Sequence, residues 1–291
     1  MITICASLGY KSPFLCPMGQ EKDANLAKAN LAKGSKSDLI ALVNAYKGWK
    51  RGGVSFARQN FLSNETMDYI HRLREDLIAA TKDVLHNVPE DHADPDLLAD
   101  ACRAVLTAGL YPNLARLRNR GKGNTLQGLP VVVHPGSVNS KEAWSQVAFY
   151  EVQETTERYM YDTTVVGLSP VLLFAPVLKE VHRKRSVVFE LERAHVKVDV
   201  KVADALQSLR GLVSTFVDRS VGAAPNASML DMASTLTQLV AEKVITVAGD
   251  EGDEEDGGSA VGDASEGTQN LLQSLRNGDL GNVEARILAD I

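Results

Sequence analysis

The segment from Ala101 to Asn139 constrains the fold of this chain more than any other stretch. Apolar residues at helical spacing predict a short buried helix at its start, and Tyr111-Pro112 breaks that helix. Two strands are expected after the break, and the second is the apolar run Val131 to Val133. A glycine-rich turn is expected between them, and His134-Pro135-Gly136 ends the second strand. Helix and strand patterns thus follow one another closely in one chain, as in an α+β fold.

The first of these two strands carries a positive face. Arg116, Arg118 and Arg120 alternate there with uncharged residues, and a two-residue period places all three guanidinium groups on the same side. Lys122 follows shortly after, so these four cations are the densest basic group in the part expected to fold. Taken alone, they fit an ordinary solvated strand face. The alternative is a face that contacts phosphate groups.

The chain before this segment predicts three helices. The first covers Glu21 to Lys33, which is rich in Ala, Leu and Lys. The second is capped by Ser37 and ended by Gly52-Gly53, and the third begins near Ser63 or Asn64. Their apolar residues recur at helical spacing, so the three helices are expected to pack as a bundle.

The chain after the segment adds further strands and helices. Ser145 to Val166 alternates apolar and polar residues, which predicts two antiparallel strands. Ser169-Pro170 opens a short helix, since proline is tolerated in a first helical turn, and Val187 to Leu191 is expected to be the last strand. An amphipathic helix is predicted over Lys201 to Val217, and a weaker one over Met229 to Val244.

Several of these runs, taken together, resemble a known family. AGLYPNLA followed by VVVHPGSVN resembles the C-terminal oligonucleotide/oligosaccharide-binding (OB) fold region of the DEAH/RHA (DExH-box) RNA helicases. Ile2 to Ala24, Ser37 to Trp49 and Asn60 to Leu77 look like the helicase-associated helical domain that precedes that fold. Tyr161 to Pro176 looks like its later part, and the resemblance extends in order over roughly Ile2 to Ser220.

The resemblance implies a helicase-associated helical bundle, then a five-stranded OB-like β-barrel, then C-terminal helices. The expected parts are residues 1–92 for the bundle, 93–220 for the OB fold with its C-terminal helix, 221–248 for a weak helical extension and 249–291 for an acidic, largely disordered tail. Met1 to Leu8 begins inside an apolar segment, so the bundle is expected to be truncated at its N-terminus.

The resemblance also implies a function. In that family these modules pack on a RecA-like ATPase core and border the channel for single-stranded RNA, so the chain is expected to be an RNA-binding accessory module of a helicase. Its expected partners are single-stranded RNA or structured nucleic acid, the ATPase core and a protein activator. The expected RNA contacts are Arg116, Arg118, Arg120, Lys122, His134 and Ser137. The family loop reads HPSS, and Gly136 replaces its first serine here.

The motifs of the ATPase itself are not found in the sequence. A phosphate-binding loop needs G-x-x-x-x-G-K-[ST], and Gly34 to Ser37 matches only its end, so a helix cap is expected there instead. No D-E-A-H sequence occurs, and the six histidines show no metal-ligand spacing. We therefore expect no catalytic residue, metal or cofactor in this chain, with ATP and magnesium bound by the core. The alternatives are a module that docks a helicase partner or activator, and an independent enzyme.

Charge and cysteine content bear on partners and compartment. Residues 246–291 contain 11 acidic and 2 basic residues, a net charge of −9, so the formal charge of −6 leaves +3 on residues 1–245. Three cysteines without CxxC spacing argue against a disulfide framework. No apolar run is long enough to span a membrane, and no signal peptide is evident. An intracellular protein, cytoplasmic or nuclear and not secreted, is expected.

Overall fold

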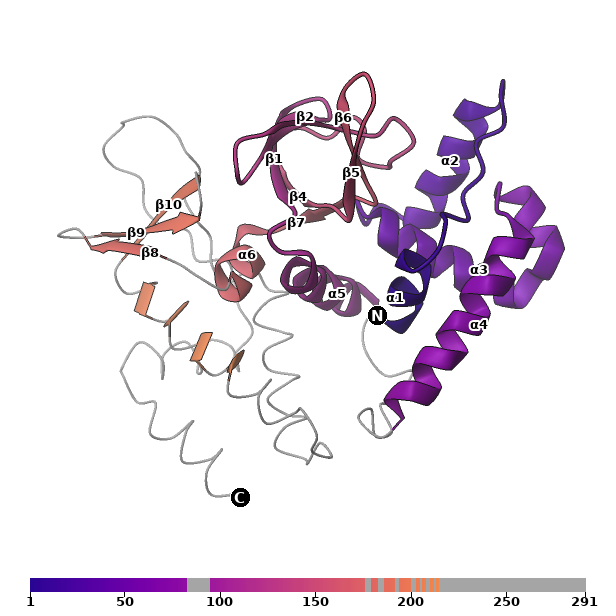
Figure 1. Ribbon diagram of the computed structural model, residues 1–291, viewed down its shortest axis with the longest axis horizontal. Coiled ribbons are helices and arrows are strands. Elements are labelled where there is room, and N and C mark those ends of the chain that lie inside the picture. The colour runs from indigo at the N-terminus through magenta and orange to yellow at the C-terminus, as the bar shows by residue number, and fades with distance from the viewer. Residues whose placement is uncertain are drawn as a thin grey trace. The chain divides into compact units, whose positions relative to one another are not determined.

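The structure is a computed structural model that describes residues 1–82, 95–175, 179–182, 186–191, 194–199, 203–204, 206–207, 210–211 and 213–214. Helices and a mixed β-sheet occur together, which confirms the predicted α+β class (Figure 1). By contacts between Cα atoms, Met1–Asp83 and Gly109–Val166 form one compact unit, and Val84–Ala108 with Gly167–Ile291 form another. The helical bundle and the barrel therefore belong to the same unit.

Four helices form the first part of this unit: α1 (Ile2–Leu8), α2 (Glu21–Ala32), α3 (Asp38–Gln59) and α4 (Asn64–Thr81). The last three are the predicted helices, and α1 is additional. α3 packs against each of the other three, and α1 also packs against α4. Their shared core consists of buried apolar side chains, among them Ala45, Trp49, Met67 and Ile70.

The predicted helix starts are confirmed by their hydrogen bonds. The Ser37 side chain accepts a bond of 3.1 Å from the backbone N–H of Ile40, and the Ser63 side chain accepts one of 3.2 Å from Thr66. The second helix does not stop at the glycine pair, because α3 runs on to Gln59. It breaks there, however, since Gly53 has φ 56° and ψ −143°, which is not a helical conformation.

Seven short strands form the barrel of the same unit. They are β1 (Leu114–Asn119), β2 (Lys122–Thr125), β3 (Pro130–Val133), β4 (Gln146–Ala148), β5 (Glu151–Glu154), β6 (Arg158–Tyr161) and β7 (Thr164–Val166). β4 and β5 are separated by two residues, as are β6 and β7, so each pair forms one longer, bent strand. Five long strands result, which is the number that the family resemblance implies.

The pairing of these strands matches an OB-like barrel. β1, β2 and β3 form an antiparallel meander, and β3 pairs in parallel with β6. β6 pairs with β5. β4 belongs to the same bent strand as β5, and it pairs with β1. The bent strand thus lies at one end of the strand order through β5 and next to the other end through β4. Figure 1 shows the strands arranged around a ring. This is the five-stranded OB topology.

Alternate residues of the strands fill the barrel interior, as a two-residue period requires. The interior side chains are Ala115, Leu117, Val131, Val133, Val147, Phe149 and Met160. Arg116 and Arg118 lie on the opposite, exposed side of β1. The predicted separation of apolar and basic faces is therefore correct for these two arginines.

The predicted strand is wrong at its C-terminal end. The register of β1 shifts after Leu117, and the strand ends at Asn119. Arg120 and Gly121 form the two-residue turn between β1 and β2. The expected glycine-rich turn also contains a strand, because β2 begins at Lys122. Gly123 permits this strand to approach β1 closely, since a Cβ there would lie 2.0 Å from the Arg116 carbonyl oxygen.

The second unit contains helix and sheet of its own. α5 (Pro95–Leu110) begins in it, and α6 (Leu168–Phe174) is the helix predicted at Ser169-Pro170. β8 (Lys179–His182), β9 (Ser186–Leu191) and β10 (Ala194–Asp199) form an antiparallel sheet in the order β10-β9-β8. β9 is the strand predicted over Val187 to Leu191, but it is not the last strand, because β10 pairs with it.

Other predictions for this unit are covered only in part. The described positions between 203 and 214 are helical, in agreement with the helix predicted there, and Leu206 on its apolar stripe is buried. The weaker helix at 229–244, the extension at 221–248 and the acidic tail at 249–291 lie outside the described residues. No helix within the described ranges is long and apolar enough to cross a membrane.

Candidate nucleic-acid interface

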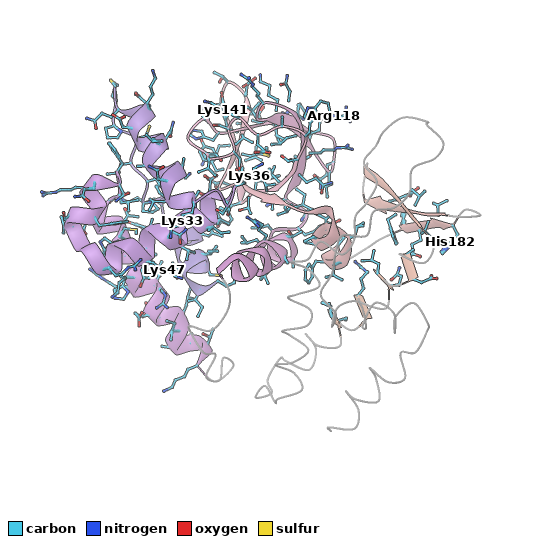
Figure 2. All side chains as sticks on the ribbon, turned by 180° about the vertical axis from the view of Figure 1, so that it is seen from behind. Lys33, Lys36, Lys47, Arg118, Lys141 and His182 are labelled. Carbon is cyan, nitrogen blue, oxygen red and sulfur yellow. The ribbon has the colours of Figure 1, made fainter. Side chains whose placement is uncertain are left out.

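Four exposed cations lie along the first hairpin of the barrel, and we call them the basic edge: Arg116, Arg118, Arg120 and Lys122. The first two project from β1, the third lies in the turn and the fourth begins β2. The Lys122 Nζ lies 3.0 Å from Glu157 Oε1, but both side chains are well exposed, so the ion pair stabilises little. Figure 2 shows Arg118 on the barrel from behind. The basic edge brings together four of the six predicted contact residues.

Two amide side chains flank the basic edge. Arg116 pairs in register with Asn124 on β2 and with Gln146 on β4. Partners directly opposite on neighbouring strands share one face of a sheet, so an amide lies on each side of the guanidinium group. Guanidinium groups bind phosphate oxygens well, and amides can donate to or accept from bases and sugars. This row of polar groups suits a polyanionic strand that carries bases.

His134 is held in a small aromatic group at the end of β3. Its ring stacks on Tyr161 with centroids 4.4 Å apart and meets Tyr159 edge-on at 5.9 Å. Its Nδ1 accepts a hydrogen bond of 3.1 Å from the Gly136 N–H, which shapes the loop. Burial, together with the nearby Lys28 charge, lowers the pKa of His134 and so favours the neutral ring. The main feature that His134 offers a ligand is its aromatic surface.

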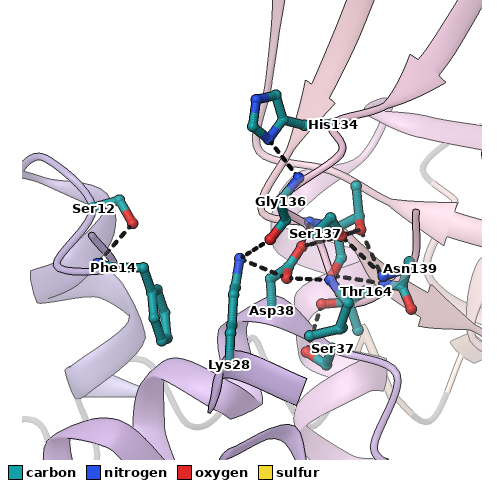
Figure 3. A network of polar contacts seen from close by, with 12 residues as sticks. Ser12, Phe14, Lys28, Ser37, Asp38, His134, Gly136, Ser137, Asn139 and Thr164 are labelled. Atoms are coloured by element: carbon teal, nitrogen blue, oxygen red, sulfur yellow. Dashed lines mark hydrogen bonds and ion pairs between the residues drawn. The ribbon is translucent and has the colours of Figure 1, made fainter. Parts of the chain in front are cut away.

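Ser137 lies in a buried polar network and not on the surface. Its side chain is 7% exposed, and its hydroxyl donates a hydrogen bond of 2.6 Å to Asp38 Oδ2 (Figure 3). Thr163 Oγ1 lies 2.8 Å from the same hydroxyl, and the Asn139 N–H donates to it at 3.1 Å. The single hydroxyl proton is thus used inside the protein, where it shapes the loop.

Asp38 is the centre of this network, although it is a charged residue only 1% exposed. Lys28 Nζ lies 2.8 Å from Asp38 Oδ1, and the backbone N–H groups of Val138 and Thr163 donate to the carboxylate at 3.1 and 3.0 Å. Figure 3 shows Asp38 at the first turn of α3, between Lys28 of α2 and Ser137 of the barrel loop. A buried carboxylate with this many donors is well compensated. It fixes the bundle to the barrel.

A cavity of about 590 Å³ lies next to this network, within the same unit. Aromatic side chains line it from both the bundle and the barrel, together with Lys28 and Asp162. Burial raises the pKa of Asp162 to about 6. These lining residues come from segments far apart in the chain, so no sequence pattern predicted the cavity. Its aromatic residues are Tyr10, Phe14, His134, Tyr150 and Tyr161.

The Gly34 to Ser37 segment does not fit a bound nucleotide. The Ser37 hydroxyl, which a phosphate loop would direct to magnesium, accepts from Ile40 and lies 2.7 Å from Thr164 Oγ1. Lys36 Nζ instead contacts Glu142 at 3.0 Å. The segment is a helix cap, as predicted. Within the part of the chain that the structure describes, no group of three or more His, Cys, Asp and Glu residues is placed to hold a metal ion.

Comparison with known proteins agrees with this architecture. Residues 102–178 match the family described as oligonucleotide/oligosaccharide-binding (OB)-fold. The chain is 31% identical over 234 residues to the DExH-box ATP-dependent RNA helicase DExH1 of Arabidopsis thaliana. The aligned region covers 76% of this chain and 24% of the relative. It is 32% identical over 203 residues to the human ATP-dependent DNA/RNA helicase DHX36, covering 60% of this chain and 19% of that protein.

A third relative extends the match along the chain. The mouse ATP-dependent RNA helicase DHX29 is 27% identical over 269 residues, which covers 84% of this chain and 19% of the relative. The chain thus spans about a quarter or less of the length of these curated relatives. The OB-fold match, the barrel topology and these relatives together show that the chain contains the C-terminal OB-fold region of a DEAH-box (DExH-box) RNA helicase.

Proposed function

We propose that this chain is an RNA-binding accessory module of a DEAH/RHA-type helicase, and that it binds single-stranded RNA through the basic edge. The observation that carries the proposal is the exposure of all four cations along one hairpin of an OB-like barrel. In OB folds, the loop between the first two strands is one of the elements that contact oligonucleotides. Arg120 lies in the equivalent turn here, so the basic edge has the expected location.

The spacing of the basic edge also suits a phosphate backbone. Arg116 and Arg118 are two residues apart on one strand, about 6.5 to 7 Å along its axis. This separation is close to that of successive phosphates in an extended single strand, so each guanidinium group can meet one phosphate. Such contacts position a strand without reading its bases. The proposed binding is therefore largely independent of RNA sequence.

The proposal includes the wider assembly in which this module acts. We infer that the basic edge borders a channel for single-stranded RNA and that a separate RecA-like core supplies ATP hydrolysis with magnesium. The capped Gly34 to Ser37 segment supports this division, because it leaves no phosphate loop among the described residues. The purified chain is accordingly expected to show no RNA-stimulated ATP hydrolysis above a mock preparation.

The test removes three charges from the basic edge. The variant Arg116→Ala/Arg118→Ala/Arg120→Ala should weaken binding to unrelated single-stranded RNAs by similar factors. Each lost phosphate contact should lower the slope of log K against log salt by about 0.7, or about 2 in all. Fluorescence anisotropy at several salt concentrations measures both quantities, and circular dichroism checks that the variant is folded.

A matched control removes the same charge elsewhere. Lys47, Arg51 and Arg58 are exposed on α3, and the triple alanine variant at these positions has the same net charge as the test variant. It should keep nearly the full affinity and salt slope. Equal losses in both variants would mean that net charge alone governs binding. No loss in the folded test variant would reduce the basic edge to ordinary solvated surface.

A second candidate function is docking of a helicase partner or activator. Three apolar side chains on and before α2 favour it, because Leu15, Met18 and Leu26 are 47%, 97% and 60% exposed. Replacing them with serine should then abolish binding of that protein and leave RNA binding unchanged. Binding through these side chains should depend only weakly on salt, unlike phosphate contacts.

A further inference from the structure

Trp144 is exposed to an unusual degree. Its side chain is 81% accessible, whereas the other tryptophan of the chain, Trp49, is 7% accessible. Among the described residues, no aromatic ring or cationic group is paired with the Trp144 indole. A large apolar ring left in water is unfavourable, so a ligand that covers it would recover that free energy.

The backbone holds this ring in place at a cost. Trp144 has φ 56°, in the left-handed region that bulky residues rarely adopt. Backbone of this kind persists where the surrounding structure fixes it, and it is frequent at ligand-binding sites. Here the flanking residues are fixed to the hairpin of the basic edge. The Leu117 N–H donates to the Ser145 carbonyl at 2.8 Å, and the Gly121 N–H donates to the Glu142 carbonyl at 2.8 Å.

These two hydrogen bonds place Trp144 beside the basic edge. They enclose residues 118–120 on one side and residues 143–144 on the other. The antiparallel register of β1 and β4 aligns Arg116 with Gln146, which follows Trp144 by two residues. Lys141, also exposed, precedes Trp144 by three residues, and Figure 2 shows both Lys141 and Arg118 on the barrel.

We propose that Trp144 is a base-stacking platform for a single-stranded nucleic acid whose phosphates contact the basic edge. The inference rests on the proposed function and adds a second kind of contact to it. Every nucleobase has a π-face, so stacking on an indole tolerates any sequence. Neighbouring strand backbones lie about 5 Å apart, so one nucleotide can place its phosphate on Arg118 and its base on Trp144.

The surroundings of the indole favour nucleic acid over a protein partner. A protein that buried this ring would be expected to cover further apolar side chains around it. Instead, the neighbours of Trp144 along the chain are mostly polar, because Lys141, Glu142 and Ser145 are polar and only Ala143 is apolar. An exposed aromatic ring among cations is the combination that single-strand-binding proteins use.

Intrinsic fluorescence of the full chain tests the proposal. Trp49 is buried and donates its Nε1–H to Asn64 at 2.8 Å, so a ligand-induced change should come mainly from Trp144. Oligouridylate is compared with an abasic ribose-phosphate oligomer of equal length. The first should bind and quench the emission, and the second should bind through phosphates without quenching it.

The variants Trp144→Ala and Trp144→Phe complete the test. Stacking on an aromatic side chain corresponds to an affinity change of about 5- to 150-fold per base, so the alanine variant should lose affinity for oligouridylate by such a factor. Its affinity for the abasic oligomer and its salt slope should stay unchanged, and the phenylalanine variant should recover most of the binding. Thermal melting checks that both are folded.

The outcomes separate this inference from the proposed function. A wild-type chain that binds neither oligomer would contradict RNA binding itself, and the stacking platform with it. A wild-type chain that binds both oligomers equally, without quenching and with no effect of Trp144→Ala, would contradict only the stacking platform.

Discussion

The Asp38 carboxylate accepts a hydrogen bond of 2.6 Å from the hydroxyl of Ser137, a residue 99 positions further along the chain. Asp38 opens α3 of the bundle, and Ser137 lies in the loop after β3 of the barrel. The contact therefore joins two parts of the fold that sequence patterns describe separately. It also shows that a loop motif shared with RNA helicases can serve the structure directly.

Removing the Asp38 carboxylate should destabilise the protein strongly. Asp38→Ala would leave Lys28 without its buried partner and several N–H donors without an acceptor, so a loss of about 3 to 5 kcal/mol is expected. Ser137→Ala removes one hydroxyl from the network and should cost about 1 to 3 kcal/mol. Urea denaturation followed by circular dichroism measures both changes.

The exposed ion pair of Glu154 and Arg158 provides the control for this prediction. Its groups lie 3.1 Å apart with the Glu154 side chain 66% exposed, so Glu154→Ala should cost less than about 1 kcal/mol. A loss at Asp38 no greater than the loss at Glu154 would contradict the structural role of the network.

The raised pKa of Asp162 predicts a dependence of stability on pH. Burial raises this pKa from 3.8 to about 6, and the Lys28 charge offsets only part of the effect. The native state therefore binds the proton more readily than the unfolded state, so stability falls as pH rises between about 4 and 6. The cost at pH 7 is at most about 3 kcal/mol, from a shift of about 2 pKa units. Asp162→Asn should remove it.

Denaturation curves at pH 5 and pH 7.5 measure this effect. The Asn variant should gain stability at pH 7.5 relative to wild type and gain less at pH 5. Asn also suits the left-handed backbone at this position, where φ is 52°, but that gain does not depend on pH. An equal gain at both values would therefore contradict the titration of Asp162.

A methyl group at Gly123 should disrupt the hairpin of the basic edge. A Cβ there would lie 2.0 Å from the Arg116 carbonyl oxygen and 2.8 Å from the Leu117 Cα, both backbone atoms that cannot easily move. Gly123→Ala is expected to cost more than about 1 kcal/mol. Gly109, in α5, has no atom within 4 Å of a Cβ, so Gly109→Ala should stabilise by up to about 1 kcal/mol. Thermal unfolding should shift in opposite directions for the two variants.

The acidic C-terminal segment should weaken RNA binding at low salt. Eight acidic residues lie between Asp250 and Glu266, and they compete with RNA for the cations of the folded part. Deletion of residues 246–291 should tighten binding at about 0.05 M salt and change little at about 1 M, where the Debye length is about 3 Å.

A second variant, in which the segment keeps its length but loses its charge, distinguishes the effect of the charge from the effect of the size of the segment. Replacing the eight acids with Asn and Gln should tighten RNA binding as much as the deletion does. Unchanged affinity in both variants would mean that the segment stays electrostatically remote from the RNA site.

The sequence predicted those features that depend on neighbours in the chain. The caps at Ser37 and Ser63 follow from local hydrogen bonds, and the separation of Arg116 and Arg118 from the barrel interior follows from strand alternation. Arg120 was misplaced because the strand register shifts after Leu117 and β1 ends at Asn119, so the alternation does not continue to Arg120.

Features formed by distant segments were not predicted. The hydroxyl of Ser137 was expected to face RNA, and only the folded chain shows that it meets Asp38. Trp144 was overlooked because its exposure depends on a turn conformation and on hydrogen bonds to the β1–β2 hairpin. The predicted RNA contacts of the basic edge and His134 remain predictions until binding is measured.

The joint at Asp38 also limits how this region can be divided or exchanged. A fragment that began at residue 109 would leave Ser137, Asn139 and Thr163, all buried now, facing water without their bundle partners. A fragment that ended at residue 83 would expose the Asp38 carboxylate with Lys28 as its main remaining partner. The bundle and the barrel therefore cannot be exchanged independently between proteins. A chimaera with another protein should keep the two together and join the other sequence outside them.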